Sequence, residues 1–161
     1  MHSAMKQHKL EITFCEYESA GELSPEDAAL VERAREMTHN SYAPYSHFNV
    51  GAAIRTSSGN IYGGANQENA AFPSGMCAER TALYYTAAAE PDSAIEAIAI
   101  AASYNGEPTQ DIVTPCGACR QALVQYEEKS GKPIRVILCA ADRFLVLNNM
   151  KSLLPFVFDI I

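Results

Sequence analysis

The sequence predicts an α/β protein in which three layers, α/β/α, are built around a five-stranded mixed sheet. The chain has 161 residues, of which 48% are hydrophobic, and this is enough to bury the core of one domain. Its segments follow the order helix, strand, strand, helix, strand, helix, strand, strand, which is typical of an α/β sandwich. Residues 141–143 alone separate the last two strands. A parallel pair needs a crossover of about a dozen residues or more, so these strands must be antiparallel neighbours.

Residues 1–23 are predicted to be an N-terminal extension of a single domain formed by residues 24–161. The extension contains a candidate strand over 10–17, and we expect it to dock on the domain or on a neighbouring subunit. The first helix is expected to begin after Ser24, a good N-cap, because a proline and two acidic residues follow it. It should end near Asn40.

A hairpin is predicted next, with strands over 48–56 and 61–65 joined by the turn 57–60. The two strands contain the glycines Gly51, Gly63 and Gly64. Glycine weakens a strand, so we expect these positions to mark a bulge or a close approach of the backbone to a ligand.

The second half of the chain contains two near-continuous apolar runs, which are typical of strands covered on both faces. Thr114 followed by Pro115 predicts the start of a helix, and Gly131 predicts its end. The remaining elements are a helix over about 76–89, a strand over 94–103, a helix over 116–129, strands over 134–140 and 144–147, and a short helix over 149–154.

The charge of the chain limits its partners. The net charge is −7 and the sequence pI is about 5.0, which argues against a nucleic-acid polymer because phosphate binding needs clustered Lys and Arg. No apolar stretch reaches 18 residues, so no membrane span is predicted. A small uncharged ligand fits these features better.

The sequence contains five cysteines: Cys15, Cys77, Cys116, Cys119 and Cys139. Their odd number, the CxxC pair and the lack of a signal-peptide pattern at the N-terminus indicate a reducing cytoplasm, in which thiolates bind metal rather than form disulfides.

Three of these thiols predict a zinc site. Cys116 and Cys119 project from one face at a helix start, because residues three apart nearly eclipse on a helical turn. Cys77, at the start of another helix, would complete a set of three protein ligands, which leaves a fourth position for water as in catalytic zinc. We expect one Zn²⁺ per subunit. Glu79 then lies near the metal without binding it, where a carboxylate could move protons.

Arg80 is the second residue that we expect to act in catalysis. Zinc with three thiolates carries a net charge of −1, which disfavours formation of hydroxide from water. The two helix N-termini would offset part of this charge, and Arg80 could donate hydrogen bonds to the sulfurs. Arg80 would thereby raise the Lewis acidity of the zinc ion.

Cys77-Ala78-Glu79-Arg80 and Pro115-Cys116-Gly117-Ala118-Cys119-Arg120-Gln121 together resemble the zinc-dependent cytidine deaminases of the small, homotetrameric type. The similarity continues through 45–53, 66–70 and 153–155. The resemblance implies the cytidine deaminase-like fold and a hydrolase acting on a cyclic amidine C–N bond. Cytidine and deoxycytidine would become uridine and deoxyuridine with release of ammonia, as part of pyrimidine salvage. Zinc-bound hydroxide would attack C4 while Glu79 shuttles the proton.

The resemblance also implies the substrate contacts. In the family, the positions that match Asn66 and Glu68 hold the ribose hydroxyl, and the position that matches Phe48 packs on the pyrimidine. Sites of the homotetramer are completed across interfaces. Positions that contact a neighbour's substrate match Ala70, Phe72 and Phe158, although Phe72 stands where these enzymes often have Tyr.

Two other interpretations remain. The chain could deaminate another small aminopyrimidine nucleoside, such as a blasticidin-type antibiotic, although those deaminases lack the Asn-x-Glu-Asn-Ala stretch that begins at Asn66. It could instead be a non-catalytic module stabilised by zinc. Such a module would want a fourth protein ligand, for which Cys15, Cys139 and His47 are the candidates.

Overall fold

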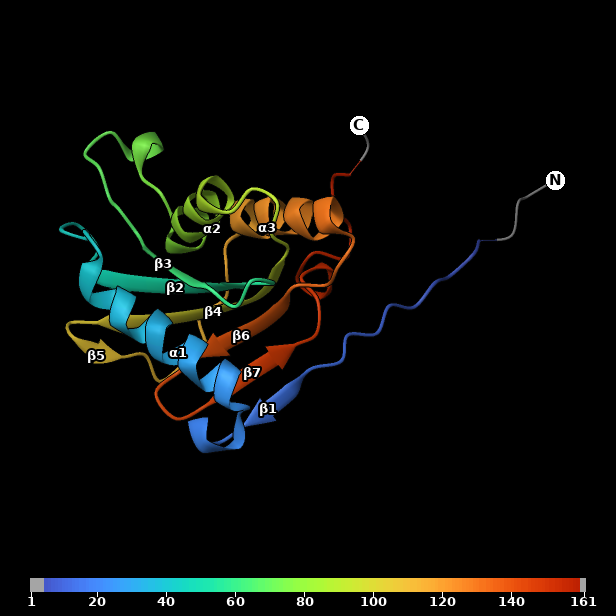
Figure 1. The fold of residues 1–161 in the computed structure, drawn as a ribbon, viewed down its shortest axis with the longest axis horizontal. Helices are drawn as coiled ribbons and strands as arrows, with labels where there is room; N and C mark the ends of the chain where they lie inside the picture. Colours follow the sequence, from blue (N-terminus) through green and yellow to red (C-terminus); the bar gives the residue numbers. More distant parts are fainter. Residues whose placement is uncertain (1–4, 160–161) are drawn as a thin grey trace.

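The computed structural model describes residues 5–159, and its helices lie on both faces of one mixed sheet (Figure 1). The helices are α1 (Pro25–Met37), α2 (Ala78–Ala89) and α3 (Gly117–Ser130). The strands are β1 (Cys15–Tyr17), β2 (Phe48–Thr56), β3 (Ile61–Ala65), β4 (Ile95–Tyr104), β5 (Glu107–Pro108), β6 (Arg135–Cys139) and β7 (Phe144–Leu147). Short 3-10 turns cover Ala20–Glu22, Thr38–Asn40, Phe72–Ser74 and Lys151–Leu153.

The sheet has the strand order β1-β7-β6-β4-β2-β3, and β5 pairs with β4. α1 covers one face, whereas α2 and α3 lie side by side on the other (Figure 1). The α/β class and the three layers are therefore confirmed. The five expected strands are present, and β1 and β5 bring the sheet to seven.

The pairing of the last two strands is also confirmed. β6 and β7 are antiparallel, with Cys139 opposite Phe144. β4 and β6 run parallel, which requires the crossover that α3 provides. Part of the predicted N-terminal extension joins the sheet, because β1 pairs with β7 and places Cys15 opposite Val146.

Two buried clusters fill the spaces between the layers. The cluster beneath α2 and α3 uses large aliphatic side chains, among them Leu83, Ile98 and Leu123. The cluster beneath α1 includes small residues of the sheet, such as Ala97 and Ala99, together with larger ones. Successive residues of a strand point to opposite faces, so β4 serves both clusters.

The glycines of the hairpin allow close packing of helices. A Cβ atom on Gly51 would lie 2.1 Å from the Ala34 carbonyl oxygen of α1, and one on Gly64 would lie 2.3 Å from the Ala82 nitrogen of α2. The expectation of a bulge or a ligand at the three glycines is wrong, because helix backbone lies over Gly51 and Gly64 and the Met37 side chain lies over Gly63. The irregularity of β2 falls between Arg55 and Thr56.

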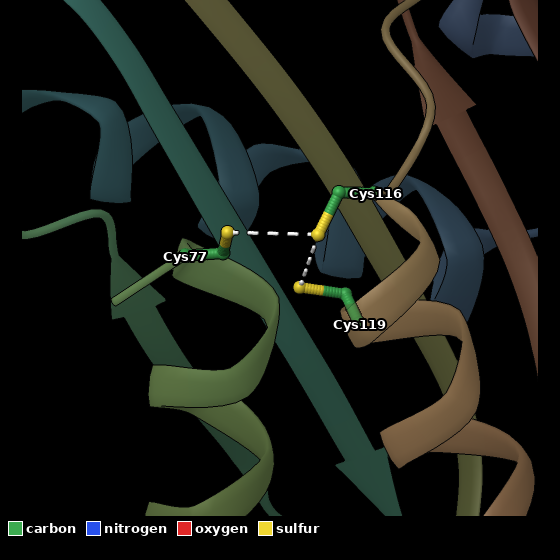
Figure 2. A group of neighbouring side chains, drawn as sticks. All are labelled: Cys77, Cys116 and Cys119. Atoms are coloured by element: carbon green, nitrogen blue, oxygen red, sulfur yellow. Dashed lines mark hydrogen bonds between the residues drawn. The ribbon is translucent and has the colours of Figure 1, made fainter. Parts of the chain in front are cut away.

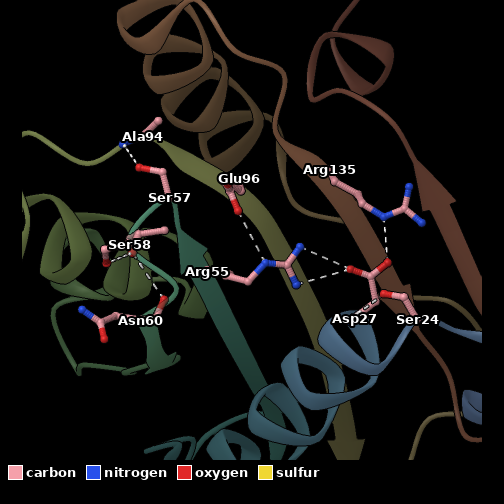
Figure 3. Close-up of polar contacts among 10 residues, drawn as sticks. Ser24, Asp27, Arg55, Ser57, Ser58, Asn60, Ala94, Glu96 and Arg135 are labelled. Atoms are coloured by element: carbon pink, nitrogen blue, oxygen red, sulfur yellow. Dashed lines mark hydrogen bonds and ion pairs between the residues drawn. The ribbon is translucent and has the colours of Figure 1, made fainter.

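A buried carboxylate joins α1 to the sheet (Figure 3). Asp27 accepts a hydrogen bond from Arg135 Nε at 2.8 Å and pairs with Arg55 at 3.5 Å. The Ser24 hydroxyl, at the N-cap of α1, accepts a hydrogen bond from the Asp27 amide. This network fixes the start of α1, where the sequence predicts it.

The N-terminal ends of α2 and α3 position two cysteines. Cys77 and Cys116 are the N-cap residues, and neither side chain caps its own helix. The sequence predicts a helix start at Thr114 and Pro115, but Pro115 lies before α3 and Cys116, with extended backbone angles, is its N-cap. Gly131 ends α3 in the left-handed conformation, as expected. Within residues 5–159, no helix is long and apolar enough to cross a membrane.

Candidate metal centre and substrate groove

Three cysteine side chains converge between the N-terminal ends of α2 and α3 (Figure 2). The sulfur of Cys116 lies 3.9 Å from that of Cys77 and 3.5 Å from that of Cys119. All three sulfurs lie within 4.8 Å of one another. Cys119 is buried, Cys77 is half-buried and Cys116 is exposed. The cluster is therefore open on one side, toward Cys116.

The geometry of this cluster fits one zinc ion. Tetrahedral zinc with Zn–S bonds of about 2.3 Å places its sulfur ligands about 3.8 Å apart. The separations in the cluster are close to this value, and no large rearrangement is needed to bind the ion. Cys15 and Cys139, the candidates for a fourth thiolate, are not members of the cluster. Three protein ligands leave one position for water or substrate.

Glu79 lies in the first turn of α2, two residues after Cys77, and interacts with Cys77 and Cys119. Glu79 is only 5% exposed to solvent. Burial raises the pKa of the Glu79 carboxyl, and the charge of Cys77 raises it further. A carboxyl group whose pKa is raised can both accept and return a proton near neutral pH. The structure thus places a buried carboxyl of raised pKa beside the thiols, and its role as a proton carrier stays a prediction.

Arg80 points its guanidinium group at the cluster. Its Nη2 donates a hydrogen bond to Cys77 Sγ over 3.8 Å, and hydrogen bonds to Cys77 and Cys119 raise the pKa of Arg80. Its buried Nε finds no hydrogen-bond partner among the described residues. Hydrogen bonds from Cys119 and then from Arg80 lower the pKa of the Cys77 thiol from 9.0 to about 5, although burial acts against them. The environment of Cys77 therefore favours its thiolate, the form that binds metal.

A groove of about 340 Å³ opens beside Cys77. Its walls come from the loop before β2, the segment after β3 and the approach to α2. The lining residues are Tyr45, Asn66, Gln67, Glu68, Asn69, Phe72, Gly75, Met76 and Cys77. A second cavity, of about 390 Å³, lies near the C-terminal ends of α2 and α3, away from the cysteines. The first cavity is the one that joins the metal cluster.

The Asn66 side chain connects the segment after β3 with Ser41 and with the start of β2, at the edge of this groove. Its side-chain oxygen accepts hydrogen bonds from Ser41 Oγ at 2.5 Å and from the Val50 amide at 2.8 Å. Its amide nitrogen donates to the Phe48 carbonyl at 2.9 Å. Asn66 therefore stabilises the start of β2 as well as lining the groove.

Glu68 is held as a carboxylate by the turn before β2. It accepts hydrogen bonds from the Ser46 hydroxyl and from the amide of Tyr45, the latter at 2.9 Å. These bonds, the one from the Ser46 hydroxyl first, lower the pKa of the Glu68 carboxyl. The neighbouring His47 has a φ of 54°, in the left-handed region, and its amide closes the turn by donating to the Ala43 carbonyl.

The remaining predicted contact residues are spread over the surface. Phe72 is 78% exposed and packs edge-on against Tyr45, with ring centroids 6.2 Å apart. Ala70 is exposed near it, and the half-buried Phe48 begins β2 outside the residues that line the groove. Phe158 is 70% exposed and lies on α3, where the Gln121 side chain bonds both its amide and its carbonyl. The structure brings Asn66, Glu68 and Phe72 to one groove, but not Phe158.

Sequence reasoning missed the parts played by Tyr45 and Ser46. Tyr45 lines the groove, and Ser46 holds Glu68. Both belong to the segment 45–53, which the resemblance includes, but the sequence assigns no role to either of these two residues. Their roles depend on a tight turn at His47, for which the sequence carries no strong signal.

Comparison with known proteins shows the family to which the chain is similar. Residues 24–131 match the family described as "Cytidine and deoxycytidylate deaminase zinc-binding region". A probable cytidine deaminase of Dictyostelium discoideum is 34% identical over 129 residues, which cover 80% of this chain and 81% of the relative. A cytidine deaminase of Halalkalibacterium halodurans is 38% identical over 123 residues, covering 76% of this chain and 80% of the relative.

Solved structures agree with the fold described above. The crystal structure of a cytidine deaminase from Burkholderia pseudomallei aligns with a TM-score of 0.68 at 36% identity, covering 81% of this chain and 97% of that one. A cytidine deaminase from Mycobacterium tuberculosis aligns with a TM-score of 0.63 at 26% identity, covering 82% of this chain and 96% of that one.

Proposed function

The chain belongs to the cytidine and deoxycytidylate deaminase family, and from this premise we propose that it hydrolyses cytidine and deoxycytidine to uridine and deoxyuridine with release of ammonia. One observation carries the proposal: the three-thiol cluster has a buried carboxyl, Glu79, beside it and a ligand-sized groove that opens onto Cys77.

Zinc bound by Cys77, Cys116 and Cys119 would lower the pKa of a water molecule and so supply a nucleophile at neutral pH. Glu79 would take up the proton that the water loses. It would return that proton to N3 of the pyrimidine and then assist the departure of ammonia. Arg80 would offset the negative charge of the thiolates through its contact with Cys77.

The groove would orient the nucleoside. Glu68 is fixed as a carboxylate and can accept a hydrogen bond from a ribose hydroxyl. Asn66 would contribute chiefly by keeping the start of β2 in place, since its polar atoms are bonded within the chain. Phe48 would offer its ring to the pyrimidine.

The enzyme is proposed to be a homotetramer that completes its sites across interfaces. Phe158 supports this arrangement, because a 70% exposed phenylalanine held on α3 by two main-chain hydrogen bonds is suited to contact a neighbouring copy. Ala70 and Phe72 would contact a neighbour's substrate in the same way. Light scattering after gel filtration should give four chains. A monomer at micromolar concentration, or full activity in Phe158→Ala, would contradict shared sites.

The proposed setting is pyrimidine salvage in the cytoplasm. A site built from three reduced thiols is suited to a reducing compartment. The proposed substrate is a free nucleoside rather than a nucleic-acid polymer, because the chain carries a net charge of −7.

The experiment that tests the proposal follows ultraviolet absorbance while the zinc-loaded protein is incubated with cytidine. Deoxycytidine, cytosine and a blasticidin-type antibiotic are incubated in parallel. Loss of absorbance confined to the two nucleosides is the expected result. Turnover of the antibiotic alone would favour the other deaminase, and no turnover with zinc bound would leave a non-catalytic zinc module.

A further inference from the structure

The Arg120 side chain donates hydrogen bonds to three different residues beside the three-cysteine cluster. It lies in the first turn of α3, directly after Cys119. Its Nε donates to the Pro115 carbonyl at 2.7 Å, its Nη1 to the Leu153 carbonyl at 2.9 Å and its Nη2 to Thr114 Oγ1 at 3.1 Å. One guanidinium group thus connects the loop before Cys116 with the C-terminal 3-10 turn.

Pro115 in this loop is buried and the Cys116 carbonyl accepts a hydrogen bond from the Arg120 amide, but the Cys116 side chain has little support of its own. Cys116 is exposed, and its side chain makes no capping bond to α3. Pro115 has no amide hydrogen to donate. Gly117, the residue after Cys116, is exposed, and a Cβ atom built on it would meet no neighbouring element within 4 Å. Cys119 differs, because burial in the helix fixes its side chain.

We propose that Arg120 is a positioning residue that holds Cys116 in place for zinc, by fixing the backbone of Thr114 and Pro115. The inference deepens the proposed function and rests on it only for the presence of zinc. Through Leu153, Arg120 also makes the metal site depend on the C-terminal segment, which comes from a different part of the chain.

The shape of the side chain explains why arginine serves here. A guanidinium group is planar and rigid, and its N–H groups reach three acceptors in fixed directions. A lysine ammonium is a single point that cannot span the same acceptors. Arg120→Lys therefore keeps the positive charge near the thiolates and removes the geometric restraint. Any effect of this variant comes from positioning and not from charge.

The test measures the rate at which the zinc-loaded protein releases zinc to an excess of a coloured chelator. Arg120→Lys should release zinc about 10-fold faster or more, the usual effect of losing a partner that orients a ligand. Thr114→Val, which removes one acceptor and nearly preserves shape, should cause a smaller increase. Cobalt in place of zinc gives a second measure, since the thiolate-to-cobalt absorption should broaden in Arg120→Lys.

A matched control separates positioning from general stability. Arg135→Lys breaks the hydrogen bond to the buried Asp27 and should destabilise the fold, yet Arg135 makes no hydrogen bond to the loop 114–116. Zinc release that speeds up equally in both variants, in proportion to lost stability, would overturn the proposal. So would a release rate for Arg120→Lys within about twofold of wild type. A wild-type protein that binds no zinc would instead contradict the proposed function itself.

Discussion

The sulfur atoms of Cys77 and Cys116 lie 3.9 Å apart, although the two residues are 39 positions apart in the chain. Each is the N-cap of a helix, and α2 and α3 lie side by side on the same face of the sheet (Figure 1). A helix N-terminus carries about half a positive charge. Two of them meet at this cluster, so the helix ends offset part of the negative charge of the thiolates, and the thiolates in turn would bind the cation.

Replacing one of the clustered cysteines should remove zinc. We expect Cys116→Ser to fall from one zinc per chain to a small fraction of it, because a hydroxyl is a poor substitute for a thiolate ligand. Cys139→Ser is the matched control, since Cys139 is buried in β6 outside the cluster and should retain full zinc. Elemental analysis of the purified variants measures this. Equal zinc in both would mean that the metal binds elsewhere.

Glu79→Gln should separate catalysis from metal binding. The amide cannot carry the proton, so kcat should fall about 10²- to 10⁴-fold while zinc content stays normal. Burial raises the pKa of Glu79 above its ordinary value of 4.5, so at neutral pH this group lowers the stability of the folded state. The zinc-free variant should therefore unfold at the same or higher urea concentration than zinc-free wild type. A kcat within about tenfold of wild type would exclude Glu79 as the proton carrier.

Asn66→Ala should destabilise the fold as well as impair activity. It leaves the Val50 amide and the Phe48 carbonyl without their partner, which should reduce the free energy of unfolding by about 2–3 kcal/mol. Asn69→Ala is the control, because Asn69 also lines the groove but its side chain accepts one backbone hydrogen bond, from the Ala71 amide. Urea unfolding of both variants makes the comparison. An equal loss of unfolding free energy in both variants would show that the hydrogen bonds of Asn66 contribute no more to stability than that of Asn69.

The metal cluster was predictable because its signals are local. Two cysteines three residues apart at a helix start must share a face, and only the distance to Cys77 needed the fold. The role of Arg120 was not predictable in the same way. Its partner Leu153 lies 33 residues away, and the contact depends on where the C-terminal segment packs after β7. β1 escaped firm prediction for a related reason. It is a three-residue edge strand, too short for a pattern, and its pairing with β7 alone defines it.

The carboxyl of Glu90 should make stability depend on acid pH. Hydrogen bonds from Asn60, Tyr62 and Ser58 lower its pKa from 4.5 to about 2. A group whose pKa is lower in the folded state stabilises the fold above the unfolded value, and that contribution is lost as the pH falls from 4.5 toward 2. Wild type should therefore exceed Glu90→Gln in stability at neutral pH, and the gap should close in acid.

Urea unfolding of the two proteins at a series of pH values measures that gap. Tyr62→Phe provides an independent check, because it removes one donor to Glu90 and leaves the carboxyl in place. It should reduce the pH-dependent part of the stability without abolishing it. A gap between wild type and Glu90→Gln that stays constant down to acid pH would contradict the role assigned to these hydrogen bonds.

Gly64→Ala should push α2 away from the sheet. The new methyl group would lie 2.3 Å from the Ala82 nitrogen and 2.8 Å from the Ala78 carbonyl oxygen, and both are backbone atoms that cannot rotate aside. Overpacking of this kind costs about 3 kcal/mol. Gly21→Ala is the control, since its nearest neighbour would be Ser19 Oγ at 3.8 Å, and its stability should stay within about 0.5 kcal/mol of wild type. Because α2 carries Cys77 and Glu79 at its start, Gly64→Ala should also lower kcat in the fraction that remains folded. Full activity per folded molecule would show that α2 can shift without moving the site.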